Sequence, residues 1–338
     1  MLSAIYKSFL SKTITIHLRF IAHMPLTHTK LRLIFLTLIL LILSCGKTNE
    51  LIQGLPINSD GDSLTSGSAT SNYPRFLGRL LNVSIYNNGI GGQTAQQIAG
   101  RQGGLPLNIT IENNKIDGGS KVNVIEITSE IAGETVPNWF LNSSSDAARM
   151  RGTVNGVACE IVRKGSQYII RSLDKTSLVI QPRALFIPDD GRKQNNCIGI
   201  YWIGRNNINL KPSSDSTIYG VIEIAAKMVA YNKSGKYLVV GILNSIGEIK
   251  GTRGYNRAML TNQKLEVIYG QHFVPMTPPT DEEMLAVNYR PTDEDRVYIA
   301  NGVFPKGLRR DATHFNDTGN ELIAKRIYKY FKANGYNK

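Results

Sequence analysis

Two short clusters in the sequence hold the residue types that nucleophilic catalysis needs. Residues 61–65 read Gly-Asp-Ser-Leu-Thr and follow a short strand-like segment. Residues 311–314 read Asp-Ala-Thr-His and precede the last helical segment. A carboxylate three residues before a histidine can accept a hydrogen bond from ring Nδ1 and leave Nε2 to take a proton from a serine. In this arrangement Asp311 would orient His314, and His314 would accept the proton of Ser63.

Each cluster also has an ordinary structural interpretation. A serine at such a turn can simply cap the helix that follows, and an isolated Asp-x-x-His is typical of a surface turn. The first cluster is not the Gly-x-Ser-x-Gly elbow of other hydrolases, because residue 65 is threonine. His272 and His314 are the only histidines after residue 44, which leaves little room for a histidine-based metal site. We therefore expect no metal.

Two further clusters, rich in glycine and asparagine, directly follow strand-like segments. Residues 87–94 read Asn-Asn-Gly-Ile-Gly-Gly-Gln-Thr, and residues 203–207 read Ile-Gly-Arg-Asn-Asn. Glycine permits the tight turns that aim backbone amides at a ligand, and an asparagine side chain can donate beside them. Together the two loops could form an oxyanion hole. Taken singly, each is an ordinary strand-to-helix loop.

The order of the four clusters resembles that of the SGNH (GDSL) hydrolases. In that family the blocks GDS, a glycine block, Gly-x-Asn-Asp and Asp-x-x-His follow one another along the chain. The resemblance covers residues 57–104 and 196–334. The sequence departs from the family at Asn207, where the family usually has aspartate, and in the polar character of residues 55–60.

This resemblance implies a role for five residues and an activity. Ser63 would be the nucleophile, His314 the general base and Asp311 the residue that orients the base. The amides of Ser63 and Gly92 and the side chain of Asn206 would form the oxyanion hole. The implied reaction is hydrolysis of a carboxylic ester through an acyl-serine, which needs no metal and no organic cofactor.

Strand-like and helix-like segments alternate in the parts of the chain that carry these clusters. The strand-like segments are nearly continuously apolar, which suits strands buried on both faces of a parallel sheet. They cover residues 83–86, 198–203 and 237–243, with a weaker one before Gly61. The helical patterns cover residues 73–81, 217–231, 257–269 and 318–331, and the last opens with a capping box at Thr318. We therefore predict a three-layer α/β/α fold with a doubly wound, flavodoxin-like parallel sheet.

A long segment with a different pattern interrupts this alternation. Within residues 105–194, apolar residues alternate with polar ones in short runs, and clusters of Asn, Gly, Asp and Ser separate the runs. This pattern indicates a small antiparallel β domain inserted into the α/β domain. The predicted domains are the hydrolase domain, residues 55–104 and 195–338, and the inserted β domain.

Residues 1–44 have the pattern of an export segment. Residues 33–43 form an apolar run behind basic residues, too short to cross a membrane that requires about 20 residues, and such a run predicts a secretory signal. Its end, Ile-Leu-Ser-Cys, resembles the bacterial lipobox, in which Cys45 is lipidated and becomes the first mature residue. An ordinary signal peptide cut nearby is the alternative. Met24 is a second possible start, and residues 45–54 would be a tether.

The charge of the chain does not point to a nucleic acid. The 338 residues have a formal net charge of +13, and without the export segment 34 basic and 26 acidic residues leave +8. These charges are scattered, so we expect no nucleic-acid partner. Together with the export segment, the composition predicts a basic protein of the bacterial cell envelope that is anchored to a membrane through Cys45. Cys159 and Cys197 lack metal-ligand spacing; they could form a disulfide or remain buried thiols.

We predict that the substrate is an O-acetylated carbohydrate. A lipolytic or general short-chain esterase is the first alternative, and a catalytically inert glycan-binding protein on the same scaffold is the second. Trp139, in the β segment, is a candidate platform for a sugar ring, whereas the strand pattern around Trp202 favours a place in the core.

Overall fold

Five parallel strands form the central sheet of the computed structural model, which describes residues 54–141, 149–208 and 216–336. Their order is β14-β13-β12-β1-β2, and neighbouring strands run parallel throughout. This is the doubly wound order in which the chain starts at the strand next to one edge, moves to that edge and then crosses to build the sheet toward the other edge. The strands are β1 (Ile57–Gly61), β2 (Ile85–Gly89), β12 (Ile198–Trp202), β13 (Tyr237–Val240) and β14 (Phe273–Val274).

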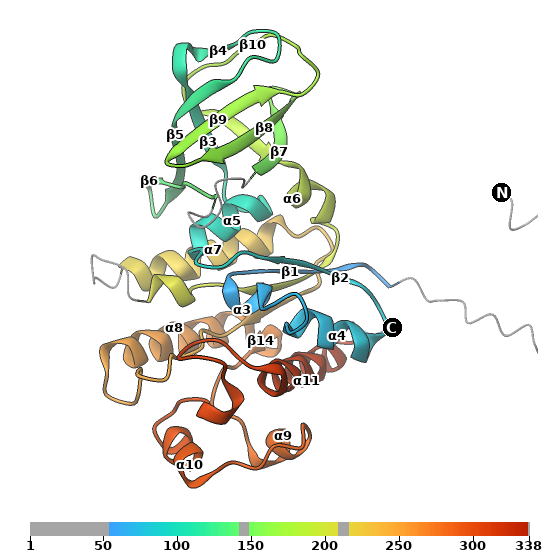
Figure 1. Cartoon of the computed structure of the whole chain (residues 1–338), viewed down its shortest axis with the longest axis vertical. Coiled ribbons are helices and arrows are strands. Elements are labelled where there is room, and N and C mark those ends of the chain that lie inside the picture. Colours follow the sequence, from blue (N-terminus) through green and yellow to red (C-terminus); the bar gives the residue numbers. More distant parts are fainter. Residues whose placement is uncertain (1–53, 142–148, 209–215, 337–338) are drawn as a thin grey trace, which may run out of the picture. The chain divides into compact units, whose positions relative to one another are not determined.

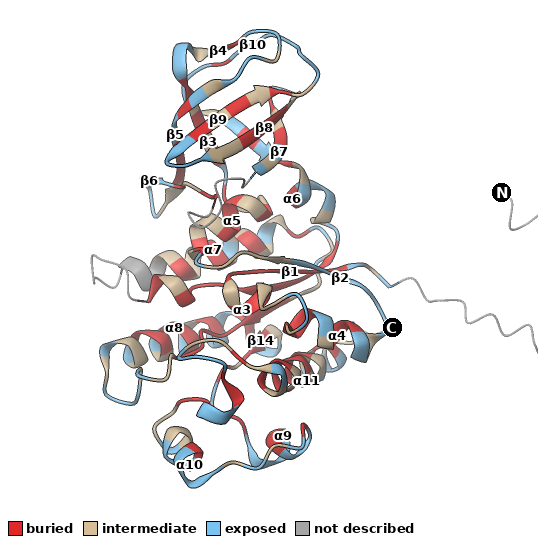
Figure 2. Cartoon of the chain, in the orientation of Figure 1, coloured by how far each residue is buried: buried red, intermediate tan, exposed pale blue. Residues whose placement is uncertain are grey.

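Helices cover both faces of this sheet, so the predicted α/β class is confirmed (Figure 1). On one face, α4 (Tyr73–Leu81) packs against α11 (Asp317–Ala333). On the other face, α7 (Ser216–Tyr231) packs against α5 (Ala95–Gln102) and α8 (Arg253–Tyr269). The strands between them are mostly buried (Figure 2).

Successive side chains of the central strands point into two different cores. Ile200 and Trp202 of β12 belong to the core shared with α4 and α11, whereas Tyr201 between them belongs to the core shared with α5, α7 and α8. This alternation is the period of two expected for a strand, and it explains why both positions are apolar in the sequence. Trp202 lies in the core, as its strand pattern indicated.

Several predicted boundaries differ from the observed ones. The second strand begins at Ile85, because Asn82 ends α4 in the left-handed conformation and Val83 is exposed. The last helix begins at Asp317, so the predicted capping box at Thr318 is wrong. Its cap is Asn316, whose side chain accepts a hydrogen bond from the Gly319 amide at 3.0 Å.

The predicted antiparallel strands close into a barrel. Strand β3 pairs with both β11 and β5, which joins the two ends of the series β3-β11-β7-β8-β9-β5. Strand β6 pairs with the C-terminal part of β5, residues 128–131, and β4 pairs with β10 in a separate two-stranded sheet. Closure leaves no open edge along the six-stranded ring. The strands are β3 (Leu107–Ile111), β4 (Lys115–Ile116), β5 (Val122–Ile131), β6 (Glu134–Pro137), β7 (Arg149–Val154), β8 (Val157–Lys164), β9 (Gln167–Ser172), β10 (Leu178–Val179) and β11 (Ala184–Pro188).

The barrel has its own apolar core, yet its contacts join it to the sheet. Leu107, Ile109, Ile127, Phe140 and Ile161 are among its fully buried residues. Residues 54–338 nevertheless form one compact unit. The division into an inserted domain and a hydrolase domain therefore stays a prediction.

Short helices that the sequence analysis did not predict complete the described chain. They are α3 (Ser63–Ser66), α6 (Asp189–Gln194), α9 (Asp281–Leu285), α10 (Asp293–Ala300) and the 3₁₀ turns η2 (Glu112–Asn114), η3 (Arg205–Asn207), η4 (Gly270–His272) and η5 (Lys306–Leu308). In the part of the chain that the structure describes, no helix combines the length and apolar character needed to span a bilayer. The export segment, Cys45 and the tether up to residue 53 lie outside the described residues.

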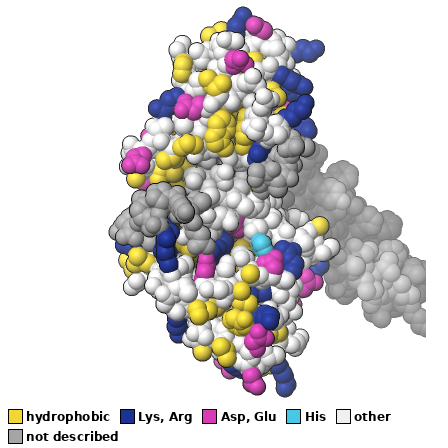
Figure 3. Space-filling model, turned by 60° about the vertical axis from the view of Figure 1, so that its left-hand side comes forward, with side chains coloured by type: hydrophobic (Ala, Val, Ile, Leu, Met, Phe, Trp, Pro, Cys, Tyr) yellow, Lys and Arg dark blue, Asp and Glu magenta, His cyan; other side chains and the backbone are white. Residues whose placement is uncertain are grey.

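The two cysteines inside the described ranges are free and buried, so the disulfide alternative for Cys159 and Cys197 is wrong. On the face shown in Figure 3, Lys and Arg side chains are spread over the surface and interspersed with Asp and Glu. This distribution agrees with the scattered charge of the sequence.

Candidate active site

Ser63 lies at the carboxyl end of β1, directly beside the point where the order of the strands reverses. Strand β1 lies between β2 and β12, and loops from these strands leave the sheet in opposite directions, which creates the crevice where doubly wound proteins bind ligands. The last residue of β1, Gly61, has to be a glycine, because a Cβ atom there would overlap Thr65 and lie 2.8 Å from the Trp202 carbonyl oxygen. The tight turn places Ser63 first in α3, so its amide has no acceptor within the helix.

The structure brings the two clusters of the sequence together. His314 Nε2 lies 2.8 Å from Ser63 Oγ, although 251 positions separate the two residues. On the other side of the ring, Nδ1 lies 2.8 and 2.9 Å from the two carboxylate oxygens of Asp311. These distances describe a continuous chain of hydrogen bonds from the carboxylate through the imidazole to the hydroxyl.

Local backbone contacts keep Asp311 in its charged form. Burial alone would raise the pKa of this carboxyl, but the amides of His314 and Thr313 and the His314 ring donate to it and hold its pKa well below the usual range. The two amides donate to Oδ1 at 2.8 and 2.9 Å. A carboxylate that stays ionised can keep the imidazole in the tautomer with hydrogen on Nδ1.

Arg309 holds the loop that carries Asp311 and His314, and the sequence analysis gave this residue no role. Its side chain is buried and donates four hydrogen bonds to backbone carbonyls, two of which belong to Ala312 and Thr313 inside the cluster. The other two belong to Phe304 and Asn244. Three of these acceptors lie within five residues of Arg309 and the fourth, Asn244, is 65 positions away, and since all four are backbone carbonyls, residue types alone do not reveal them.

The glycine loop after β2 packs against the turn that carries Ser63. The Ile90 amide donates to the Gly61 carbonyl at 3.1 Å, and a Cβ atom on Gly91 would lie 3.6 Å from Ser63 Cβ. Gly92 follows with a φ of +75°, a conformation that favours glycine. The predicted oxyanion residue Gly92 is therefore in the loop next to the serine.

Asn206 also reaches this turn, but its amide already has two acceptors. Its Nδ2 donates to the Gln93 carbonyl at 2.8 Å and, more weakly, to Asp62 Oδ2 at 3.3 Å. The longer contact is the one that an oxyanion beside Ser63 could replace. Asp62, which the sequence analysis left without a role, thus connects Asn206 to the turn, and its Oδ1 accepts from the Leu64 amide at 2.9 Å.

Asn207, the position where the sequence departs from the SGNH pattern that it resembles, has a partner for both side-chain atoms. Its Oδ1 accepts a hydrogen bond from the Ala95 amide at the start of α5 at 2.8 Å, and its Nδ2 donates to Gln96 Oε1 at 3.1 Å. An amide oxygen can satisfy a free amide at a helix start as a carboxylate does. Beside it, Arg205 forms a two-point ion pair with Glu248 at 2.6 and 2.7 Å, which anchors the same loop.

Burial of Asp62 leads to a testable dependence of stability on pH. Burial raises the pKa of Asp62 to about 7, against the opposing effects of the Leu64 amide and the Arg205 charge. Because the folded pKa lies above the unfolded value, the contribution of Asp62 to stability is complete below about pH 4 and is lost as the pH rises through 7. Between pH 5 and 8 this loss should amount to about 2 kcal/mol.

Asp62→Asn removes this titration, so the free energy of unfolding of the wild type relative to this variant should fall by that amount between pH 5 and 8. Urea unfolding of both proteins at the two pH values measures it. All other carboxyl groups are common to both proteins and cancel in the difference. A difference that is the same at pH 5 and pH 8 would show that Asp62 does not titrate in this range.

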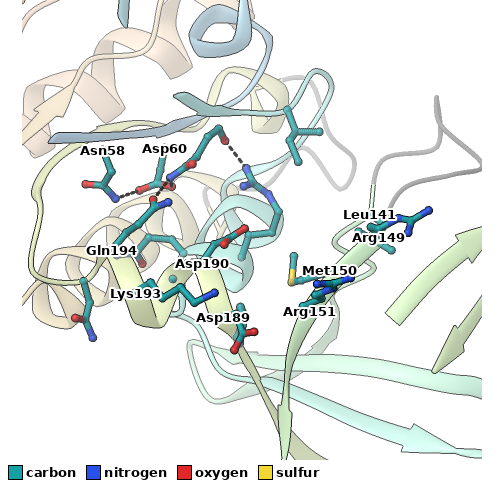
Figure 4. Close-up of a pocket in the computed structure, with 17 residues that line it drawn as sticks. Asn58, Asp60, Leu141, Arg149, Met150, Arg151, Asp189, Asp190, Lys193 and Gln194 are labelled. Carbon is teal, nitrogen blue, oxygen red and sulfur yellow. Dashed lines mark hydrogen bonds between the residues drawn. The ribbon is translucent and has the colours of Figure 1, made fainter. Parts of the chain in front are cut away.

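A separate cavity of about 420 Å³ lies on the side of β1 that faces α5, α6 and β7, and explains the polar character of the first strand (Figure 4). Asp60 lines it and accepts hydrogen bonds from Asn58 at 2.8 Å and Asn88 at 3.0 Å. Burial raises the pKa of Asp60 to about 6, although the nearby Arg101 charge and the Asn88 hydrogen bond lower it. Asp60 thus has donors from its own strand and from β2 inside the sheet.

Within the described ranges, no three His, Cys, Asp or Glu side chains are close enough together to hold a metal ion.

Comparison with known proteins gives similarity at the level of structure. No model of a known protein family matches the sequence, and no curated protein matches it. Similar solved structures include a lipolytic protein of the G-D-S-L family from Desulfitobacterium hafniense DCB-2, with 12% identity and a TM-score of 0.41 over 82% of this chain and 99% of that one. The acetyl xylan esterase AlAXEase has 14% identity and a TM-score of 0.42 over 81% and 98%.

A third similar structure is a peptidoglycan O-acetylesterase, with 14% identity and a TM-score of 0.35 over 83% of this chain and 91% of that one.

Proposed function

We propose that this protein is an exported carboxylic ester hydrolase that forms an acyl intermediate on Ser63 and removes O-acetyl groups from a carbohydrate. The observation that carries the proposal is the chain of hydrogen bonds from Asp311 through His314 to Ser63, with separations of 2.8 to 2.9 Å. A serine hydroxyl is a weak nucleophile until a neighbouring base takes its proton. The geometry supplies that base and the carboxylate that orients it.

The proposed reaction has two steps with the same proton carrier. His314 Nε2 takes the proton of Ser63 as Oγ bonds to the carbonyl carbon, and it returns the proton to the alcohol oxygen as the ester bond breaks. Water then attacks the acyl group and gives a proton to His314, which passes it to Ser63 as the carboxylic acid leaves. The Ser63 and Gly92 amides and the Asn206 side chain would stabilise the negative oxygen of both tetrahedral intermediates.

The surroundings of the glycine loop favour a carbohydrate ester over a long-chain lipid ester. A cavity of about 360 Å³ begins at Gly92, and polar and aromatic side chains make up most of its lining, with Leu141 as the aliphatic member. A long acyl chain would be bound by aliphatic side chains, whereas sugar hydroxyls require hydrogen-bonding partners.

A lipolytic or short-chain esterase of broad specificity is the first alternative, and the same site would serve it. The second alternative is an inert scaffold that binds glycans. The hydrogen-bonded Ser63 and His314 disfavour it, because a binding protein has no physical need for this arrangement.

Export and anchoring are part of the proposal. The apolar run at residues 33–43 and the lipobox-like end at Cys45 support secretion and a lipid anchor in a bacterial cell envelope.

The test compares esters that differ in acyl length and in alcohol. Acetate release from acetylated xylan, and turnover of acetyl, butyryl and octanoyl esters of p-nitrophenol, would be measured with the full chain and with Ser63→Ala. We expect the wild type to prefer acetyl over octanoyl esters by at least about tenfold and to deacetylate the glycan. A preference for octanoyl esters would support the lipolytic alternative. Glycan binding without turnover of any ester would support the inert scaffold.

A further inference from the structure

The cavity that begins at Gly92 lies between the glycine loop and the barrel. Its lining combines residues of the glycine loop and α5 with residues of the barrel, the latter including Trp139, Arg163 and Tyr168. Its volume, about 360 Å³, is at the lower end of the range for small-molecule sites. Gly92, which lines the cavity, directly follows Gly91, and a Cβ atom on Gly91 would lie 3.6 Å from Ser63 Cβ, so the cavity adjoins the loop that packs against the serine.

Three hydrogen bonds tie the segment that carries Trp139 to the α5 region. Gln97 donates to the Trp139 carbonyl at 2.7 Å, and Gln93 donates to the Phe140 carbonyl at 2.5 Å. Asn138 donates to the Gln96 carbonyl at 2.9 Å. The Gln93 carbonyl also accepts a hydrogen bond from the side chain of Asn206, the candidate oxyanion donor. The backbone of Trp139 is therefore held at a fixed place relative to the site.

The Trp139 ring packs against the ring of Tyr168. Trp139 is half-buried, and its ring lies 4.8 Å from that of Tyr168, which is itself 6% exposed. Tyr168 is in turn fixed by its hydroxyl, which donates to the Leu141 carbonyl at 2.7 Å. Hydrophobic side chains gather on the barrel in the face shown in Figure 3. A tryptophan packed on one side and accessible on the other has the amphipathic character of a ligand platform.

Arg163 supplies the charge in this cavity. Its guanidinium lies 5.9 Å from the centre of the Tyr168 ring, its Nε donates to the Gly165 carbonyl, and its Nη1 donates to Leu141. These contacts hold the guanidinium at the cavity, where its N–H groups can donate to a ligand oxygen.

We infer that Trp139 and Arg163 form the subsite for the sugar ring that carries the acetyl group. The flat indole packs against the apolar face of a pyranose, and the guanidinium donates to its oxygens. This inference rests on the proposed function, since the sugar is the alcohol part of the ester. In this proposal the barrel selects the alcohol part of the ester on which Ser63 acts.

A purely structural role for Trp139 predicts different behaviour. If the residue only packs the barrel against α5, its loss should lower the activity on every ester equally by destabilising the protein. If it binds the sugar, its loss should affect only esters of sugars. A useful reference substrate is ethyl acetate, whose alcohol part has no ring to pack against Trp139 and no further hydroxyl to accept from Arg163.

The experiment uses the full chain, Trp139→Leu, Trp139→Ala and Arg163→Gln, with acetylated xylotriose and ethyl acetate as substrates. Leucine keeps apolar contact with Tyr168 if alanine prevents folding. Tyr86→Ala is the matched control, because Tyr86 is 51% exposed on the edge strand β2 and lies outside the cavity. We expect KM for the sugar ester to rise about 10- to 100-fold in the Trp139 variants, with kcat/KM for ethyl acetate within twofold of the wild type.

Tryptophan fluorescence separates this inference from the proposed function. The chain has two tryptophans, and Trp202 is 1% exposed in the core, so a change on adding unacetylated xylotriose reports on Trp139. A fluorescence change without esterase activity would support the subsite and overturn the proposed enzyme. Sugar-ester hydrolysis that the Trp139 variants leave unaltered would support the enzyme and overturn the subsite. Equal losses on both substrates would also overturn the subsite.

Discussion

Replacing Ser63 by alanine should lower kcat by about 10⁴- to 10⁶-fold on any ester that the protein hydrolyses. The reason is that His314 Nε2, 2.8 Å from Ser63 Oγ, then has no hydroxyl to deprotonate. Binding should change little, because the substitution removes one oxygen atom and no charge. Steady-state kinetics of the purified variant on acetyl esters, together with a thermal melt to verify folding, measures the effect.

Ser66→Ala is the matched control for this variant. Ser66 is the last residue of the same short helix, and its hydroxyl makes only a long 3.4 Å contact with the Ser63 carbonyl. We expect its kcat to stay within about threefold of the wild type. If Ser63→Ala retained more than a tenth of the wild-type kcat, a serine nucleophile at this position would be excluded.

Replacing Asn206 by alanine should lower kcat by about 10²- to 10³-fold with little change in KM. An oxyanion donor acts on charge that exists in the tetrahedral intermediate and not in the bound ester, so its loss affects the chemical step. For this role, Asn206 Nδ2 has to give up its 3.3 Å contact with Asp62 Oδ2 and donate to the oxyanion. Pre-steady-state and steady-state kinetics on p-nitrophenyl acetate separate acylation from deacylation.

The neighbouring residue serves as the comparison for Asn206. Asn207→Ala removes an amide of the same size that accepts from the Ala95 amide at the start of α5, so it should reduce stability by about 1 kcal/mol and leave kcat nearly unchanged. Equal reductions of kcat in both variants would mean that the loop as a whole matters and that Asn206 is not a specific donor. An unchanged kcat in Asn206→Ala would remove Asn206 from the oxyanion hole.

Residue types and local periodicity were sufficient to predict the α/β class and the segments of the candidate site. Strand β12 is apolar at every position because both of its faces are buried, and this pattern is visible without a structure. The Asp311 and His314 pair could also be recognised locally, since three positions across one turn bring a carboxylate to the ring. The order of the four clusters then indicated which serine faces this pair.

Long-range geometry decided the features that the sequence did not show. The closing of the antiparallel strands into a barrel depends on the pairing of β3 with both β5 and β11, and no local pattern in β3 specifies two partners. The first strand looked weak because a sequence shows polarity and not partners; Asp60 is tolerated in the sheet because Asn58 and Asn88 donate to it.

The sequence by itself thus determined which residues are able to do the chemistry and the periodicity of the elements that carry them, because both depend on neighbours within a few positions. Only the tertiary structure decided how those residues are held. Arg309 fixes the loop of His314 through carbonyls as distant as that of Asn244, and Trp139 is held beside α5 because Gln97 donates to its backbone carbonyl. Such bonds join residues far apart in the chain, and their acceptors are backbone groups that every sequence contains, so residue types alone cannot reveal them.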